Sequence, residues 1–410
     1  MSLQGTNLEH ARRRNRRVAF EAVLKHGPLS RSEIARMTGL TSQTASNIAG
    51  ELIALGLIKE TGRRLGRKGQ PATEYVVDDE GAYTIGIHLD QNQLVGLLVD
   101  VLGHIVARTA LPIARQNPGE VLPLVERAVD GLVNGNDEIR RRLLGLGAVM
   151  PGFFESGTFA SRGPLTMEGW LDFPLAQELS ERLNLPVFVD NDATAAAIGE
   201  SLYGFGQTHP TFIYIYFGLG LGGGIVIDGR PFTGVRQRAA ELGHLIVNPG
   251  GKPCACGNRG CLERYVSLHS AYEAILQTEN EWQGASPDLL LKAFQTGNNA
   301  LAKWLDDAAY YLRIAVNGLE NLFDPSGIVV GGLLPDPILT ALVEKTFPLL
   351  PSSAADPGTR GARLIKGEVR FDTPAAGAAA LPMSRLLHPL AKEDGPELEN
   401  AAGAGLFGAL

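Results

Sequence analysis

Two segments far apart in the sequence share one pattern, and this repeat restricts the fold more than any other feature. Residues 83–100, YTIGIHLDQNQLVGLLVD, and residues 212–228, FIYIYFGLGLGGGIVID, each consist of an apolar strand, a tight turn, a second apolar strand and a closing Asp. Each segment looks like the opening hairpin of an α/β unit, because further strands and helices follow it. Two similar α/β lobes predict a cleft between them.

Apolar periodicity extends both lobes, which we assign to residues 81–205 and 206–390. The first lobe is expected to contain strands near residues 83–89, 93–101, 104–112, 143–149 and 186–189 and helices near 119–133 and 191–203. The second is expected to contain helices near 263–278, 287–296 and 299–322 and a buried strand at 327–332. Residues 391–410 lack usable periodicity and are a candidate for a disordered tail.

Residues 1–80 form a separate head that differs from the lobes in charge. Residues 1–77 contain 13 Lys or Arg against 6 Asp or Glu, a net charge of +7, so the remainder carries −14 of the total of −7. A small basic head on a large acidic body suggests that the head alone binds nucleic acid.

The head carries the signals of a helix-turn-helix. After a helix near residues 16–26, Ser30 and Glu33 form a capping box for the next helix, and Gly39 ends that helix. Thr41 caps another helix, whose short polar side chains would reach base edges in the major groove of double-stranded DNA. The candidate DNA-contacting residues on it are Ser42, Gln43, Thr44, Ser46 and Asn47.

A hairpin after Gly56 predicts a wing beside these helices. Its Gly-rich turn carries Arg63, Arg64, Arg67 and Lys68, which would follow phosphates or enter a minor groove. The alternative is a solvated basic loop on a small helical domain. A run of arginines nearer the N-terminus would add non-specific phosphate contacts; they are Arg12, Arg13, Arg14, Arg16 and Arg17.

Composition points to an ordinary globular protein, with 44% hydrophobic and 20% charged residues in a chain of 410. No apolar run approaches the ~20 residues of a membrane span, and no apolar segment follows the basic N-terminus as it would in a signal peptide. We therefore expect a cytoplasmic protein without a membrane partner.

All three cysteines fall in one loop, at Cys254, Cys256 and Cys261, with glycines that let the chain fold back on itself. Three thiolates leave one position of a tetrahedral zinc site open, and His244 is the nearest candidate for it. The alternative is a set of buried or disulfide-bonded cysteines, which would leave one thiol unpaired. We expect structural Zn²⁺ bound by His244 and the three cysteines.

These motifs together resemble the ROK family of sugar kinases and sugar-responsive repressors. The resemblance rests on ELGH followed by CxCGxxGCxE, with MPG at 150–152, VDNDATAAAIGE at 189–200, GLGLGGG at 218–224 and VVGG at 329–332. It implies a two-lobed actin-like α/β fold of the sugar kinase and RNase H-like type. The winged helix-turn-helix ahead of that fold is similar to the xylose-repressor or N-acetylglucosamine-repressor type, since kinases of the family generally lack it.

The resemblance also implies a sugar site formed by Gly152, Asn191, Asp192, Glu241, His244 and Glu263. Asp192 matches the family's catalytic base, and His244 would serve both zinc and sugar. Without the family, the residues themselves favour a helix cap at Asn191 and a first-turn acid at Asp192 over a sugar site.

The chain departs from the family's kinases in the first hairpin. There the kinases carry an Asp and a Gly-Gly-Thr-like turn for ATP and Mg²⁺, whereas this chain has His88 and no glycines. In the second hairpin the glycines remain, but Leu219 replaces a hydroxyl residue, and a glycine run can equally mark a tight hairpin. We therefore expect ATP and Mg²⁺ binding to be weak or lost, and Asp192 to be a vestigial base.

The sequence thus predicts a repressor of sugar uptake or catabolism genes, controlled by a monosaccharide in the cleft and bound to operator DNA as a homodimer or higher homo-oligomer. One alternative is an active ATP-dependent sugar kinase with an added regulatory head. Another is a regulator controlled by a protein partner such as a sugar-transport component.

Overall fold

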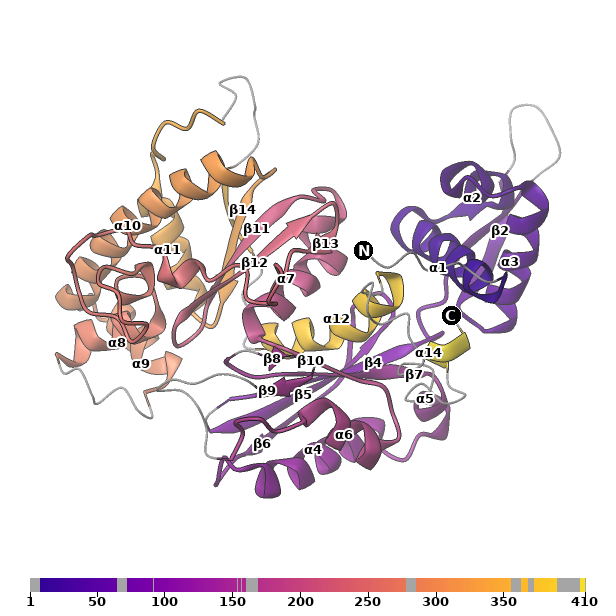
Figure 1. Ribbon diagram of the computed structural model, residues 1–410, viewed down its shortest axis with the longest axis horizontal. Coiled ribbons are helices and arrows are strands. Elements are labelled where there is room, and N and C mark those ends of the chain that lie inside the picture. Colours follow the sequence, from indigo (N-terminus) through magenta and orange to yellow (C-terminus); the bar gives the residue numbers. More distant parts are fainter. Residues whose placement is uncertain are drawn as a thin grey trace.

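A head and a two-lobed body make up the chain in the computed structural model (Figure 1). The structure describes residues 8–64, 72–90, 92–152, 154–155, 157–159, 169–277, 285–354, 363–367, 372–388 and 406–409. Within these residues the expected α/β body with a winged helix-turn-helix in front of it is confirmed.

The head contains three helices and a three-stranded sheet in the order β1-β3-β2. Its elements are α1 (Leu8–His26), β1 (Leu29–Ser30), α2 (Arg31–Thr38), α3 (Ser42–Ala54), β2 (Ile58–Arg64) and β3 (Ala72–Val77). The local signals hold as expected: Ser30 and Glu33 form the capping box of α2, Gly39 adopts a left-handed conformation after it, and Thr41 caps α3.

The first lobe is built on a five-stranded sheet in the order β10-β7-β4-β5-β6. Its strands are β4 (Tyr83–Leu89), β5 (Gln93–Asp100), β6 (Ile105–Pro112), β7 (Leu143–Val149) and β10 (Val187–Asp190), and β8 (Phe154–Glu155) and β9 (Thr158–Phe159) form a small separate ribbon. Its helices are α4 (Pro118–Val133), α5 (Asp137–Arg141), α6 (Leu175–Leu183) and α7 (Asp192–Tyr203). The strands β10, β7 and β4 run parallel, so their carboxyl ends meet at one edge of the sheet.

The second lobe repeats this topology, with strands in the order β13-β12-β11-β14-β15. The strands are β11 (Phe212–Phe217), β12 (Leu221–Ile227), β13 (Arg230–Pro231), β14 (Ile328–Gly332) and β15 (Leu364–Lys366). Its helical segments are η1 (Phe205–Gln207), η2 (Leu242–His244), η3 (Leu262–Arg264), α8 (Leu268–Leu276), α9 (Pro287–Gln295), α10 (Asn299–Phe323) and α11 (Asp336–Thr346). In each lobe an antiparallel hairpin is followed by two parallel strands, so the internal repeat predicted from the sequence is real.

The second lobe was expected to span residues 206–390. The last long helix in that range, α12 (Thr373–Leu387), instead packs on the first lobe. It packs on β4, β7 and α7 and is buried along nearly its whole length (Figure 1). A side chain at Gly86 on β4 would collide with the carbonyl of Ala375, and one at Gly147 on β7 with that of Ala378. These glycines therefore permit a close approach between helix and sheet that a larger residue would prevent.

The expected tail, 391–410, is partly ordered, whereas residues 391–405 and 410 lie outside the described residues. Leu406–Ala409 form a short helix, α14, near β7. Leu406 packs against a hydrophobic cluster that continues from the head through α7 to α12, and this apolar contact is the reason that these four residues depart from the expected disorder.

Candidate metal centre and interlobe cleft

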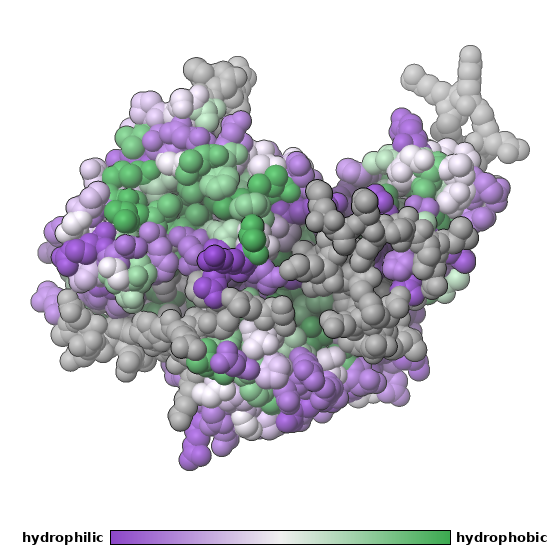
Figure 2. All heavy atoms as spheres, viewed as in Figure 1, coloured by the Kyte–Doolittle hydropathy of each residue, from purple (hydrophilic) through white to green (hydrophobic). Residues whose placement is uncertain are grey.

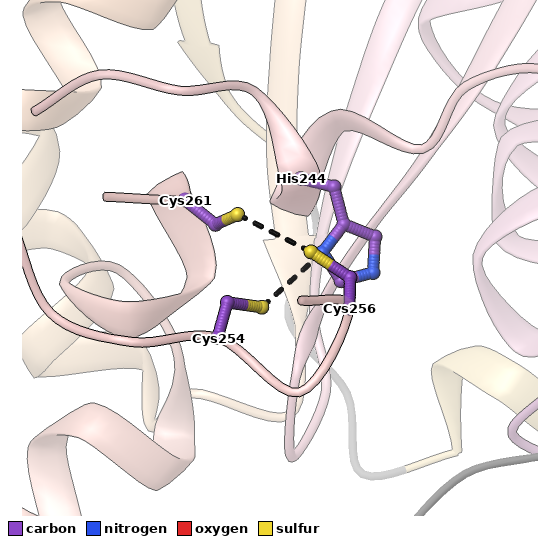
Figure 3. Close-up of side chains that lie close together, drawn as sticks. All are labelled: His244, Cys254, Cys256 and Cys261. Atoms are coloured by element: carbon purple, nitrogen blue, oxygen red, sulfur yellow. Dashed lines mark hydrogen bonds between the residues drawn. The ribbon is translucent and has the colours of Figure 1, made fainter. Parts of the chain in front are cut away.

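The three cysteines and His244 converge on one point of the second lobe (Figure 3). Two isolated bridges, Ile246 with Cys261 and Pro253 with Arg259, fold the loop back on itself, and η2 carries His244 to it. The four potential ligand atoms lie within 4.8 Å of one another. The structure therefore brings together the four residues expected to bind zinc.

Two of the separations within this cluster match those of a tetrahedral metal site. The Cys256 and Cys261 sulfurs are 3.6 Å apart, and the Cys254 sulfur lies 3.6 Å from His244 Nδ1. Zn–S bonds of about 2.3 Å and Zn–N bonds of about 2.0 Å at tetrahedral angles require separations of roughly 3.5–3.8 Å between ligand atoms. The donor set and its geometry thus suit Zn²⁺, which would close this loop structurally.

The thiols of this cluster differ in acidity. A backbone hydrogen bond from Asn258 lowers the pKa of Cys256 to about 7, whereas burial raises the pKa of Cys254 and of Cys261. Since a metal binds thiolate, the exposed Cys256 is the thiol most ready to be the first ligand.

His244 has a carboxylate near each ring nitrogen. Its Nδ1 points toward the sulfurs and lies 3.5 Å from Glu263 Oε1, and its Nε2 lies 3.8 Å from Glu241 Oε2. Cys254 donates a hydrogen bond of 3.0 Å to Glu263 Oε1. The metal ligands and two of the expected sugar ligands are therefore one connected cluster, in which a metal on Nδ1 would orient Nε2.

Asn191 and Asp192 lie where β10 passes into α7. Asn191 is the N-cap of the helix, because its Oδ1 accepts a 2.6 Å hydrogen bond from the Thr194 amide, and Asp192 Oδ1 accepts one of 2.9 Å from the Ala193 amide. The helix-cap interpretation is thus correct, and it leaves the Asn191 side-chain NH₂ and Asp192 Oδ2 to meet a ligand.

Asp192 has an unusual environment for an acid. Loss of solvent around its carboxyl raises its pKa from 3.8 to about 7, with a smaller contribution from Asp90. The turn of the second hairpin faces it, since a Cβ at Gly218 would lie 3.7 Å from Asp192 Oδ2 and one at Gly220 would lie 3.2 Å from Glu263 Oε2. The glycine turn thus joins the first-lobe and second-lobe halves of the expected sugar site.

Gly152 follows β7 at the edge of the sheet where β10 and β4 also end. Its φ of 129° is one that side-chain-bearing residues rarely adopt, so the backbone requires glycine here. Much of the loop beyond it, residues 153, 156 and 160–168, lies outside the described residues.

Two residues near Asp192 were not predicted as site residues. Asp90 follows β4 at this same edge, and Tyr216 on β11 is 1% exposed with a hydroxyl that has no hydrogen-bond partner among the described residues. Burial, followed by Asp192 and Asp90, raises the pKa of Tyr216. An Asp at the end of a parallel strand is a signal that sequence reasoning could have used, whereas the unpartnered hydroxyl appears only after folding.

The recognition-helix candidates begin α3. Gln43 and Asn47 are exposed and joined by a 3.0 Å side-chain hydrogen bond, and Ser42 is exposed beside them. Ser46 instead accepts a bond from Arg31, and the Thr44 hydroxyl meets that of Thr41. Of the candidate residues on α3, Ser42, Gln43 and Asn47 thus present their side chains outward most fully.

The basic residues of the head that were expected to contact DNA differ in where they lie and in what they bind. Arg63 and Arg64 end β2, whereas Arg67 and Lys68 lie outside the described residues. Arg12 and Arg16 of α1 both pair with Glu51 of α3, at 2.5 and 3.2 Å. Those two arginines therefore fix α1 to α3, which differs from the phosphate contacts expected of them.

None of the helices among the described residues combines the length and the apolar character of a membrane span.

Known proteins match the chain in two parts. Residues 84–384 match the model of the ROK family, and residues 19–68 match that of the MarR family. A crystal structure described as a ROK family transcriptional regulator, a homologue of the E. coli MLC protein, superposes with a TM-score of 0.72 at 24% identity and covers 92% of this chain and 97% of that one. The superposition supports the fold of head and body together.

Relatives include both regulators and enzymes. The xylose repressor of Bacillus subtilis is 27% identical over 316 residues, 77% of this chain and 81% of the repressor. A glucokinase of Halalkalibacterium halodurans is 33% identical over 263 residues, 60% of this chain and 79% of the enzyme. Similarity of the body alone therefore does not distinguish a repressor from a kinase. That distinction depends on the head and on the candidate sugar site.

Proposed function

The chain belongs to the ROK family, and we propose that it is a sugar-responsive transcriptional repressor whose kinase-like body senses a monosaccharide. The observation that carries this proposal is the union, in one chain, of a winged helix-turn-helix with an outward-facing Gln43–Asn47 pair and a two-lobed body that carries the candidate sugar ligands. The xylose repressor, which is named for a repressor function, aligns with 77% of this chain. A cytoplasmic location follows from the DNA partner.

The sugar would lie between the first-lobe pair Asn191 and Asp192 and the second-lobe set Glu241, His244 and Glu263. Carboxylates suit a polyhydroxylated ligand, because each accepts several hydrogen bonds. Zn²⁺, when bound to the Cys₃His set, would contribute a rigid cross-link rather than chemistry. A sugar that bridges the two halves would favour the closed arrangement of the lobes.

Contacts between head and body offer a route for this signal. Glu21 of α1 lies 3.8 Å from the imidazole of His388, the residue after α12. The next turn of α1 approaches the second lobe, since a Cβ at Gly229 would lie 3.9 Å from Lys25 Nζ. Helix α1 thus borders both lobes, and a change in their relative position would reorient the head.

A homodimer would supply two recognition helices, because one helix reads too few bases for a specific operator. The body exposes hydrophobic surface on its second lobe (Figure 2). Tyr310 and Leu322 on α10 are 56% and 72% exposed, and the partly buried Ile314 lies between them at helical spacing. This face of α10 is our candidate for self-association.

The first test is a thermal-melting screen of the full-length protein against D-xylose, D-glucose and N-acetyl-D-glucosamine, each with and without Mg-ATP. A ligand present at about 100 times its Kd adds about 2.7 kcal/mol to the unfolding free energy. Stabilisation by a sugar alone, followed by sugar-dependent release of DNA fragments selected from a random pool, is expected. DNA binding that no sugar alters would favour control by a protein partner instead.

The rival function is an ATP-dependent sugar kinase with a DNA-binding head. The glucokinase similarity and the raised pKa of Asp192, which suits a general base, favour it. ADP release that depends on a sugar and is abolished in Asp192→Ala would establish the kinase. Absence of turnover with a sugar that does stabilise the protein would leave the repressor.

A further inference from the structure

The head joins the first lobe through a short connection, residues 78–82, that lies between β3 and β4. The connection is hydrogen-bonded to the head, because the Asp78 amide donates a 3.0 Å bond to the Leu57 carbonyl. The Gly81 amide donates a 2.9 Å bond back to the Asp78 carbonyl, and a Cβ at Gly81 would collide with the Gly56 carbonyl. Residues 78–82 therefore form a packed turn rather than a flexible linker.

One side chain of the first lobe, Arg142, contacts this turn from the other side. Its Nη1 donates a 3.0 Å hydrogen bond to the Glu80 carbonyl, and a Cβ at Gly56 would lie 3.4 Å from the same nitrogen. Its Nε donates a 2.7 Å hydrogen bond to Glu138 Oε1 on α5. The guanidinium is planar and carries several donors in fixed directions, so a single side chain makes these bonds at the same time. Arg142 thus joins α5, the connection and the residues that follow α3.

The turn that Arg142 contacts closes the candidate recognition helix. Gly56 lies two residues after the end of α3, where its φ of 73° lets the chain turn away from the helix. A cation at the C-terminal end of a helix is favoured by the helix dipole. Beneath this contact, Leu57 of the head and Leu144 of β7 belong to one buried hydrophobic cluster. Polar and apolar contacts together therefore hold the end of α3 on the first lobe.

Strand β7 connects this contact to the candidate sugar site. Arg142 immediately precedes β7 (Leu143–Val149), which is buried along its whole length and lies between β10 and β4. Gly152, a candidate sugar residue, follows the opposite end of the strand. Seven residues of strand span roughly 23 Å, and pairing on both sides makes such a strand stiff. The end of the recognition helix and one wall of the candidate sugar site thus belong to one unit.

We propose that Arg142 couples sugar binding to DNA binding by fixing the recognition helix to the first lobe. The inference rests on the proposed sugar-sensing function and adds to it the contact through which that function is regulated. Because the head is held on the first lobe, a sugar that moves one lobe against the other carries the recognition helix with the first lobe. Without the Arg142 contact the head no longer follows that movement. The coupling is then lost while the sugar site and the DNA-binding surface stay intact.

Two alanine variants separate this contact from the loss of a positive charge. Arg141 pairs with the same Glu138 carboxylate at 2.6 Å, and among the described residues no hydrogen bond or ion pair joins it to the head. The affinity of the full-length protein for DNA fragments selected from a random pool is measured with and without a sugar that stabilises it. In Arg142→Ala the sugar should change DNA affinity by less than about twofold, with the affinity for sugar alone within about threefold of the unaltered protein. Arg141→Ala should keep the full effect of the sugar.

Hydrogen exchange tests the contact without sugar or DNA. Mass spectrometry of peptides that span residues 76–84 follows the bonded amides of Asp78 and Gly81. In the unaltered protein we expect these amides to exchange about a hundredfold more slowly than in an unstructured peptide. Arg142→Ala should speed their exchange by about tenfold, whereas Arg141→Ala should leave it unchanged. The measurement on the unaltered protein does not depend on how either variant folds.

The outcomes are distinct. Amides of the connection that exchange as fast as an unstructured peptide in the unaltered protein overturn the inference, and so does a full sugar effect in Arg142→Ala. Loss of the sugar effect in both alanine variants alike also overturns it, because Arg141 has no bond to the head among the described residues. Each of these results leaves the sugar sensor intact. DNA binding of the unaltered protein that no sugar alters contradicts the proposed function itself, and the inference falls with it.

Discussion

The opening hairpins of the two lobes, β4–β5 and β11–β12, share a topology but not a turn. The second turn keeps glycine at Gly218 and Gly220, whereas the first leads from a buried His88 into Asp90. Packing explains why the glycines of β12 remain: a Cβ at Gly222 would lie 2.5 Å from that of Ala193, one at Gly224 would collide with Ala197, and one at Gly223 with Leu242. The packing of α7 and of η2 against β12 therefore requires these glycines whether or not a phosphate binds.

This contrast shows that a glycine run alone is not evidence for nucleotide binding. The second hairpin is held by neighbours on both sides, so its sequence does not report nucleotide binding. The first turn has no glycine in residues 88–92, and no comparable packing constraint among the described residues accounts for its polar and charged residues. The first turn is therefore the more informative of the two about ligand binding.

The largest effect should come from the metal loop, which supports the second hairpin through Leu242 and Gly243. Cys256→Ser, or chelation, is expected to lower the unfolding free energy by about 4 kcal/mol or more and to abolish sugar stabilisation with it. Thermal melting with and without sugar measures both, and added Zn²⁺ should restore the chelated protein but not the variant. A full sugar response in metal-free protein would show that the second hairpin does not need the metal.

Gly224→Ala tests whether packing is what preserves the glycines of β12. The new methyl group would meet Ala197 on α7, so we expect a loss of about 2–4 kcal/mol in unfolding free energy, measured by denaturant titration. The control is Gly131→Ala on α4, where nothing lies within 4 Å of the added Cβ and the helix should gain up to about 1 kcal/mol. Equal stabilities for the two variants would refute the packing explanation.

Asp192→Asn tests the acid that the glycine turn covers. Because the pKa of Asp192 is raised from 3.8 to about 7, the folded protein keeps a proton that the unfolded chain releases between these values. The stabilising contribution is complete below about pH 3.8 and is lost as the pH rises through about 7. The variant should therefore gain roughly 1–3 kcal/mol over the unaltered protein between pH 5 and 8. A difference that is constant with pH would mean that the carboxyl is ionised throughout.

Tyr216→Phe should have the smallest effect, because the hydroxyl it removes has no hydrogen-bond partner among the described residues. We expect a change within about 1 kcal/mol, in the stabilising direction. The matched control is Tyr75→Phe in the head, which is also fully buried but accepts a 2.7 Å hydrogen bond from Arg31 and should lose about 1–2 kcal/mol. A larger loss at Tyr216 would reveal a partner that forms in solution.

Local signals made the head and the hairpins predictable. The caps at Ser30 and Thr41 act within one helical turn, and the apolar runs of β4 and β11 are long enough to be recognised alone. The position of α12 was not predictable, because its alanine-rich sequence has no polar face and its place depends on glycines more than 200 residues earlier in the chain. The candidate site likewise contains residues that local sequence predicts and residues that it does not.

Within the site, the cysteines and His244 lie close in the sequence, so their convergence could be predicted. The family resemblance proposed Asp192, Glu241 and Glu263, and the structure places Asp192 and Glu263 at the glycine turn and Glu241 and Glu263 beside His244. Asp90 was missed although its place at the end of a parallel strand was a usable signal. Tyr216 was missed because the burial of its hydroxyl depends on residues distant in the sequence.

The return of α12 to the first sheet has a consequence for how the chain is made. Residues 83–190 emerge from the ribosome long before residues 373–387. During synthesis the face of the first sheet that α12 covers is therefore exposed until α12 has been made. The second lobe, whose strands and helices lie between residues 205 and 366, can complete its own core earlier. The head, which precedes both lobes in the sequence, therefore gains its contact with α12 only after residues 373–387 have been made, and a chain truncated before residue 373 would leave the head without this contact to the body.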